Sequence, residues 1–124
     1  MKILMLMSGG AIGTLLRYFT YELTKREGVS LNYWGTFTVN IVGAFVIGLL
    51  WGMLDIKSLN PHLKSFLFVG LLGGFTTFST FALDVMSHTN SGNFKTAAFY
   101  LLGSNAMALI LVFMGFFIGK YLSL

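Results

Sequence analysis

The chain has 124 residues, of which 56% are hydrophobic and only 10% are charged, and it has no cysteine. This composition leaves too little polar surface to coat a soluble globule, so it indicates a membrane protein, and it excludes disulfides and thiolate chemistry. The formal net charge of +4 is spread thinly along the chain, which fits contact with lipid headgroups and argues against a nucleic-acid partner.

Four apolar segments are each long enough to cross a bilayer as a helix, which takes about 20 residues. The predicted helices cover about 3–23, 33–54, 62–86 and 94–121, and Pro61 stands where it can open the third. We expect the first to be retained, because Arg17 interrupts its apolar run and no small-residue cleavage site follows it. The sequence therefore predicts an all-α membrane protein with one transmembrane domain, residues 1–124, and both termini on one side.

Lysine and arginine are divided almost evenly between the two sides of this predicted bundle. One side carries Lys2, Lys57, Lys64 and Lys120, and the other carries Lys25, Arg26 and Lys95. Because the asymmetry of these residues sets orientation, so balanced a chain has little reason to insert only one way. We therefore expect dual topology and an antiparallel homodimer, which forms inverted repeats about an axis in the membrane plane. A monomer or a parallel oligomer oriented by other means is the alternative.

In the first helix, Gly9, Gly13 and Arg17 fall four residues apart and share one face. The two glycines are most simply a packing surface for a neighbouring helix. Arg17 lies within the apolar run, where an ionised side chain is costly and is a candidate for function. Two interpretations of Arg17 stay open, because its long side chain could attract an anion or reach the interface by snorkelling.

Polar residues also lie within the second and fourth helices. Asn40 is the only amide on its face of the second helix. A buried amide needs partners, so it either joins two helices or presents its NH2 group to an anion. In the fourth helix, Tyr100 and Ser104 share a face with Ala108, and the two hydroxyls could line a narrow wet path.

The third helix contains the strongest local signal, the stretch from Gly73 to Phe81. It combines a glycine pair with the hydroxyl residues Thr76, Thr77, Ser79 and Thr80 and three phenylalanines. The glycines weaken the helix, and non-helical backbone at membrane depth is tolerated only inside protein or beside a water-filled cavity. A break here would offer carbonyl oxygens to a hard cation such as Na+ and amide groups to an anion. Phe78 could join Phe81 in presenting ring edges to a small anion, although core packing explains their spacing more simply.

Asp84 follows this stretch, and we expect it at a mouth of the protein, because an unpaired carboxylate is costly in the dry core. His62 and His88 lie far apart in the sequence without a carboxylate cluster, so no zinc or iron site is expected. The chain has no Ser/His/Asp set, P-loop, dinucleotide fingerprint or paired carboxylates, which indicates that it is not an enzyme.

Taken together, the segments Gly9–Tyr18, Gly35–Gly43 and Gly73–Phe81 strongly resemble the Fluc (CrcB) family of fluoride channels. The resemblance spans all four helices. It implies a passive, fluoride-selective channel in a prokaryotic plasma (inner) membrane, which exports fluoride and relieves its toxicity. It also implies an antiparallel dual-topology homodimer with two pores beside its interface, and a third helix broken near the bilayer midplane.

The resemblance also implies roles for individual residues. The fluoride pore would use Asn40, Phe78, Phe81, Ser79, Thr80, Tyr100 and Ser104. A structural Na+ at the dimer interface would be held by main-chain carbonyls that match Gly73 and Thr76 of both subunits. Arg17 would lie near the aqueous vestibule. Ala108 stands where a third hydroxyl could continue the track of the fourth helix, so that end of the track lacks one.

Two other functions fit a short chain of four spans. A small dual-topology multidrug transporter needs a membrane-embedded carboxylate to exchange protons for cationic drugs, but the first helix offers Arg17 and only a terminal Glu22. A membrane assembly subunit without transport activity would use its glycines and hydroxyls only to join helices. Under that interpretation, Asn40→Asp or Phe81→Ile would perturb assembly and alter no ion flux.

Overall fold

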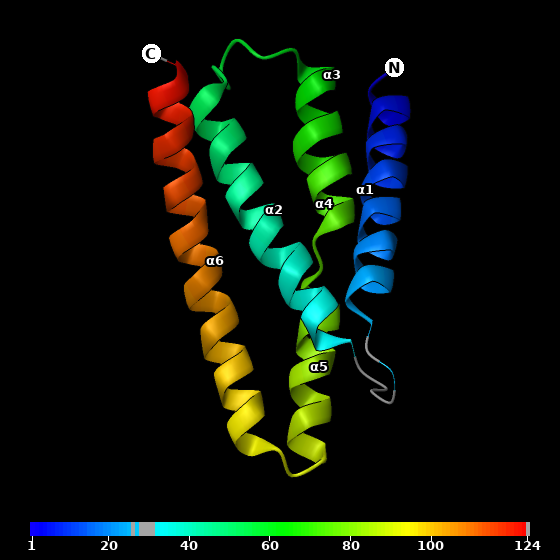
Figure 1. Ribbon diagram of the computed structural model, residues 1–124. Coiled ribbons are helices and arrows are strands. Elements are labelled where there is room, and N and C mark those ends of the chain that lie inside the picture. The colour runs from blue at the N-terminus through cyan, green and yellow to red at the C-terminus, as the bar shows by residue number, and fades with distance from the viewer. Residues whose placement is uncertain (26, 28–31, 124) are drawn as a thin grey trace.

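The computed structural model is a helical bundle with four spans that are long and apolar enough to cross a membrane (Figure 1). The structure describes residues 1–25, 27 and 32–123. Within them the order is α1 (Lys2–Thr24), α2 (Tyr33–Met53), α3 (Pro61–Lys64), the π-helical segment η1 (Ser65–Leu71), α4 (Leu72–Phe75), α5 (Phe78–Asn90) and α6 (Phe94–Ser123). The described residues form no strand. The prediction of an all-α chain with four membrane-spanning helices is therefore confirmed.

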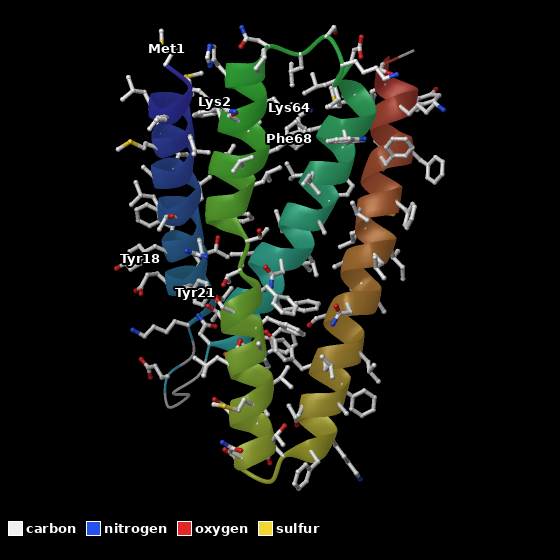
Figure 2. The ribbon with its side chains drawn as sticks, turned by 180° about the vertical axis from the view of Figure 1, so that it is seen from behind. Met1, Lys2, Tyr18, Tyr21, Lys64 and Phe68 are labelled. Carbon is white, nitrogen blue, oxygen red and sulfur yellow. The ribbon has the colours of Figure 1, made fainter. Side chains whose placement is uncertain are left out.

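Successive spans run in opposite directions, so the two ends of the chain lie at the same end of the bundle (Figure 1). Figure 2 labels Lys2 and Lys64 at this end, close to Met1. Lys25 follows α1 at the opposite end, whereas Arg26, which the charge count places beside it, lies outside the described residues.

Side chains begin three of the helical segments by accepting hydrogen bonds from free backbone amides. Asn32 accepts from the Gly35 amide at α2, and Asn60 accepts from the His62 amide at α3. Thr77 does the same at α5, where its hydroxyl accepts from the Thr80 amide. These polar caps satisfy amides that have no partner within their own helix.

Glycines bring the backbones of neighbouring helices into direct contact. A methyl group added at Gly48 of α2 would strike the carbonyl of Val112 in α6, and one added at Gly13 of α1 would strike the carbonyl of Leu71. The other glycines in such contacts include Gly9, Gly52, Gly74, Gly115 and Gly119. The interpretation of Gly9 and Gly13 as a packing surface is confirmed, and close backbone approach of this kind favours association of helices in lipid.

Two extended residues lie between α4 and α5 within the third span. Thr76 has φ −85° and ψ 159°, and Thr77 has φ −152° and ψ 118°. The Thr76 amide still donates to the Leu72 carbonyl over 3.0 Å, but the Thr77 amide donates to a side chain of another helix. We call Thr76 and Thr77 the connecting turn.

Candidate functional site

Asn40 of α2 holds the connecting turn through both backbone groups of one residue. Its Nδ2 donates to the Thr77 carbonyl over 2.9 Å, and its Oδ1 accepts from the Thr77 amide over 2.8 Å. In a continuous helix that amide would donate to the carbonyl of Gly73. The Asn40 amide therefore replaces a backbone partner, and only one of its N–H groups remains for another acceptor.

The hydroxyl of Thr77 connects the turn to the first residues of α5. It donates to Thr80 Oγ1 over 3.0 Å and lies 3.5 Å from Ser79 Oγ. Ser79 and Thr80 therefore lie together at the start of α5. They face a cavity of about 520 Å³ that is also lined by Thr14, Arg17, Tyr18, Tyr21 and Thr77. Figure 2 shows Tyr18 and Tyr21 on the half of α1 that is farther from Met1.

A second cavity, of about 200 Å³, also borders Thr77. It is lined by Asn40 of α2, Thr76 and Thr77 of the turn, Phe78 and Phe81 of α5, and Ser104, Asn105 and Ala108 of α6. We call this the amide cavity and the larger one the arginine cavity. Of the predicted pore residues, Asn40, Phe78, Phe81 and Ser104 line the amide cavity, whereas Ser79 and Thr80 line the arginine cavity.

The two predicted pore phenylalanines differ in their surroundings. Their ring centroids lie 5.7 Å apart, but Phe78 is 77% exposed whereas Phe81 is 5% exposed. Phe81 also packs against Tyr100, with ring centroids 5.2 Å apart. Phe81 therefore belongs to the core of the single chain, and Phe78 projects from it.

Tyr100 and Ser104 present different polar groups from α6. The Tyr100 hydroxyl donates to Asp84 Oδ2 over 3.1 Å, and Asp84 is only 2% exposed. The expectation that Asp84 lies at a mouth of the protein is wrong, because its side chain is buried. The hydrogen bond from the tyrosine hydroxyl helps to compensate the cost of burying the carboxylate. Ser104 is also buried, and its hydroxyl has no hydrogen-bond partner among the described residues.

Arg17 reaches the connecting turn from α1. One guanidinium nitrogen donates to the Thr76 carbonyl over 3.2 Å, and the side chain lines the arginine cavity. The side chain thus turns toward the connecting turn, and the contact is with a carbonyl oxygen. The cation lies beside Ser79 and Thr80, so the three residues form a polar wall.

Main-chain oxygens are the candidate ligands for a cation. The described residues hold no group of three or more His, Cys, Asp or Glu side chains that could bind a metal. The carbonyls of Gly73 and Thr76 lie where α4 ends, at the negative end of its helix dipole. Because the Thr77 amide donates to Asn40, it is not the helical partner of the Gly73 carbonyl. A methyl group added at Gly73 would meet only the Phe68 carbonyl, at 3.9 Å, so this side of α4 is open.

The sequence analysis did not identify two of the residues that line the cavities. Thr77 was expected only to rebond free backbone groups, yet it borders both cavities and is the residue that Asn40 holds. Asn105 was not considered at all, and its side chain lines the amide cavity. The sequence feature that could have identified Asn105 is its side-chain amide within the most apolar of the four spans.

Comparison with known proteins identifies relatives over nearly the whole chain. Residues 4–116 match the family described as CrcB-like protein, Camphor Resistance (CrcB). A protein of Parabacteroides distasonis named fluoride-specific ion channel FluC is 40% identical over 119 residues, which are 96% of this chain and 93% of the relative. Proteins of the same name from Agrobacterium fabrum and Aquifex aeolicus are 41% identical over 123 residues and 39% identical over 116. These alignments cover 98% of both chains in the first case, and 92% of this chain and 93% of the relative in the second.

Proposed function

This chain belongs to the CrcB-like family, and from that membership we propose that it is a fluoride-specific ion channel and not an enzyme. The observation that carries the proposal is the 40% identity to a fluoride-specific channel over 96% of the chain. The two cavities that meet at Thr77 support it, because each combines hydrogen-bond donors with apolar or aromatic walls. Passive export through the inner membrane would relieve fluoride toxicity.

The donors around Thr77 suit a small and strongly hydrated anion. Fluoride must exchange its water for protein donors, and the hydroxyls of Ser104, Ser79 and Thr80 can provide them. Asn40 retains one N–H beyond its two bonds with the turn. Phe78 can offer its positive ring edge, and the Arg17 guanidinium raises the local potential for anions.

A structural Na+ at the end of α4 is part of the proposal. Oxygen ligands suit a hard cation, and the Gly73 carbonyl lacks the Thr77 amide as its helical partner. The Thr76 carbonyl accepts from Arg17, but its oxygen has two lone pairs and can serve both partners. One chain supplies two such carbonyls, so a site with more ligands needs a second copy. When bound, the ion would supply a fixed positive charge between the two chains.

We further propose that two chains pair antiparallel in dual topology, with the connecting turns near the bilayer midplane. The even division of lysine and arginine over the two ends removes the usual bias in orientation. Phe78 is largely exposed on the single chain. A methyl group at Gly10 would meet nothing within 4 Å, so α1 leaves room for a close neighbour. A second copy would enclose the open cavities.

Flux from liposomes tests the proposed function. Purified protein is reconstituted into vesicles loaded with potassium fluoride or potassium chloride, and efflux is started with valinomycin in the absence of a proton gradient. Fluoride is expected to leave far faster than chloride. Negligible efflux of both ions would exclude a channel, and efflux that requires a proton gradient would favour the multidrug type of coupled transport.

Labelling of single termini in cells tests the dual topology independently. A cysteine added at one end of this cysteine-free chain should react with impermeant reagent from both sides of the membrane in similar amounts. Labelling from one side alone would contradict dual topology. In an antiparallel pair the two added cysteines lie on opposite sides of the membrane, so a short cysteine crosslinker should join few pairs.

A further inference from the structure

The amide cavity has fewer free donors than its lining suggests. The side-chain oxygen and one N–H of Asn40 already form hydrogen bonds with the backbone of Thr77. Phe78, Phe81 and Ala108 contribute no hydroxyl or amide side chain. The Ser104 hydroxyl has no hydrogen-bond partner among residues 1–25, 27 and 32–123. An anion that gave up its hydration shell here would need at least one donor more.

Asn105 is placed to provide that donor. It lies three residues before Ala108 and next to Ser104, so the three side chains form one patch on α6. Its Nδ2 donates to the Leu101 carbonyl of its own helix over 2.7 Å, which fixes the side chain along the helix. The second N–H of that nitrogen and the oxygen Oδ1 remain for other partners.

The surroundings of Asn105 also point to a polar partner. The residue is exposed on the single chain, in a span of 30 residues with the highest mean hydropathy of the four. An amide that faced lipid at this depth would leave an N–H group unsatisfied, at a cost of several kcal/mol. Contact with a water-filled cavity would remove that cost, and Asn105 lines the amide cavity.

We infer that Asn105 is a further anion-binding residue of the pathway, which completes the donors of the amide cavity together with Ser104 and Asn40. It adds a polar group to the α6 side of the cavity lining, where Ala108 has none. This inference rests on the proposed function as a fluoride channel. It adds a specific claim, that the second N–H of Asn105 bonds the passing ion.

Three substitutions separate the donor from the shape of the side chain. Asn105→Leu removes the amide, Asn105→Asp keeps the shape but replaces the donor with a negative charge, and Asn105→Gln keeps the donor. A hydrogen bond to a charged group contributes about 1.5–3 kcal/mol, so loss of it should slow fluoride efflux at least about tenfold. Asn105→Leu and Asn105→Asp are expected to show this loss, and Asn105→Gln is expected to retain most of the flux. Ile110→Ala, on an exposed part of α6 away from the cavity lining, is the control and should leave efflux unchanged.

All variants are compared with the unchanged protein in the same liposomes, and the fraction that elutes as a dimer is measured alongside. Efflux by Asn105→Leu or Asn105→Asp equal to that of the unchanged protein overturns the inference and leaves the proposed function intact. An equal loss in Asn105→Gln also overturns it, because the loss then follows packing and not the donor. If Asn105→Leu does not fold, the fluoride efflux of Asn105→Asp alone tests the inference. Absence of fluoride efflux from the unchanged protein overturns the proposed function itself.

Discussion

Asn40 and Thr77 are joined by two reciprocal hydrogen bonds, in which a side-chain amide pairs with a backbone amide as a neighbouring β-strand would. The pair holds the extended residue without help from a continuous helix. It also places Thr77 between the amide cavity and the arginine cavity. One side chain of α2 therefore holds the residue that lines both cavities.

Asn40→Asp should lower both stability and fluoride efflux. The carboxylate can still accept from the Thr77 amide, but it loses the bond to the Thr77 carbonyl and faces that oxygen with a negative charge. We expect a loss of about 1–3 kcal/mol in the free energy of unfolding, measured by thermal melting in detergent. Efflux should fall as well, because the charge repels the anion. Thr38→Ala, which removes a hydroxyl bonded only within α2, is the control, and equal losses in the two variants would contradict the prediction.

Gly48→Ala should weaken the packing of α2 against α6. The added methyl group would strike the Val112 carbonyl, and relief requires the two helices to separate. Overpacking of this kind costs about 1–3 kcal/mol. Gly103→Ala is the matched control, because its methyl group meets nothing within 4 Å and alanine favours helix by about 1 kcal/mol. Circular dichroism should show a lower melting temperature for the first variant only.

Arg17→Gln should slow fluoride efflux most strongly at low ionic strength. The guanidinium lines the arginine cavity, and its positive charge concentrates anions there. We expect about a tenfold loss at low salt and a smaller one near 1 M salt, where the screening length is about 3 Å. Lys25→Gln removes the same charge just beyond the end of α1 and should change efflux less. A loss independent of salt would show that Arg17 acts by holding the Thr76 carbonyl.

The loop after α2 should respond to acid through Asp55. Hydrogen bonds from Ser58 and from the Lys57 amide hold the pKa of Asp55 below its usual value of 3.8. A carboxyl whose pKa is lowered by folding stabilises the loop fully above the unfolded pKa, and this effect is lost as pH falls through the folded pKa. The protection of the Lys57 amide against exchange, followed by nuclear magnetic resonance in micelles relative to the intrinsic rate at each pH, should therefore fall below about pH 3.8. In Asp55→Asn this acid-dependent loss of protection should be absent.

Much of the fold follows from features that act within one segment. Hydropathy and length predicted the four spans, and Pro61 and Asn60 mark the start of the third. The glycine spacing in α1 predicted a packing surface, because close backbone approach in lipid depends on small side chains. These predictions needed no knowledge of which helices become neighbours.

The site depends on contacts between segments, and for that reason less of it could be predicted. Asn40 was recognised as a polar residue with two possible roles, but its pairing with Thr77, 37 residues away, required the fold. Asp84 was misplaced because its partner Tyr100 lies on another helix. Asn105 was missed because the periodicity of apolar residues identifies the apolar faces of a helix. It does not predict whether a single amide among apolar neighbours faces a cavity.

The two halves of the third span pack against different helices, η1 and α4 against α1, and α5 against α6. During synthesis, α1 and α4 are both complete before translation reaches α6. The first half can therefore dock while the chain is still being made, whereas α5 and α2 acquire their main neighbour only when the last helix arrives. The amide cavity, which α6 lines with Ser104, Asn105 and Ala108, is thus completed last, and truncation within α6 should leave α1 and α4 paired but this cavity without one wall.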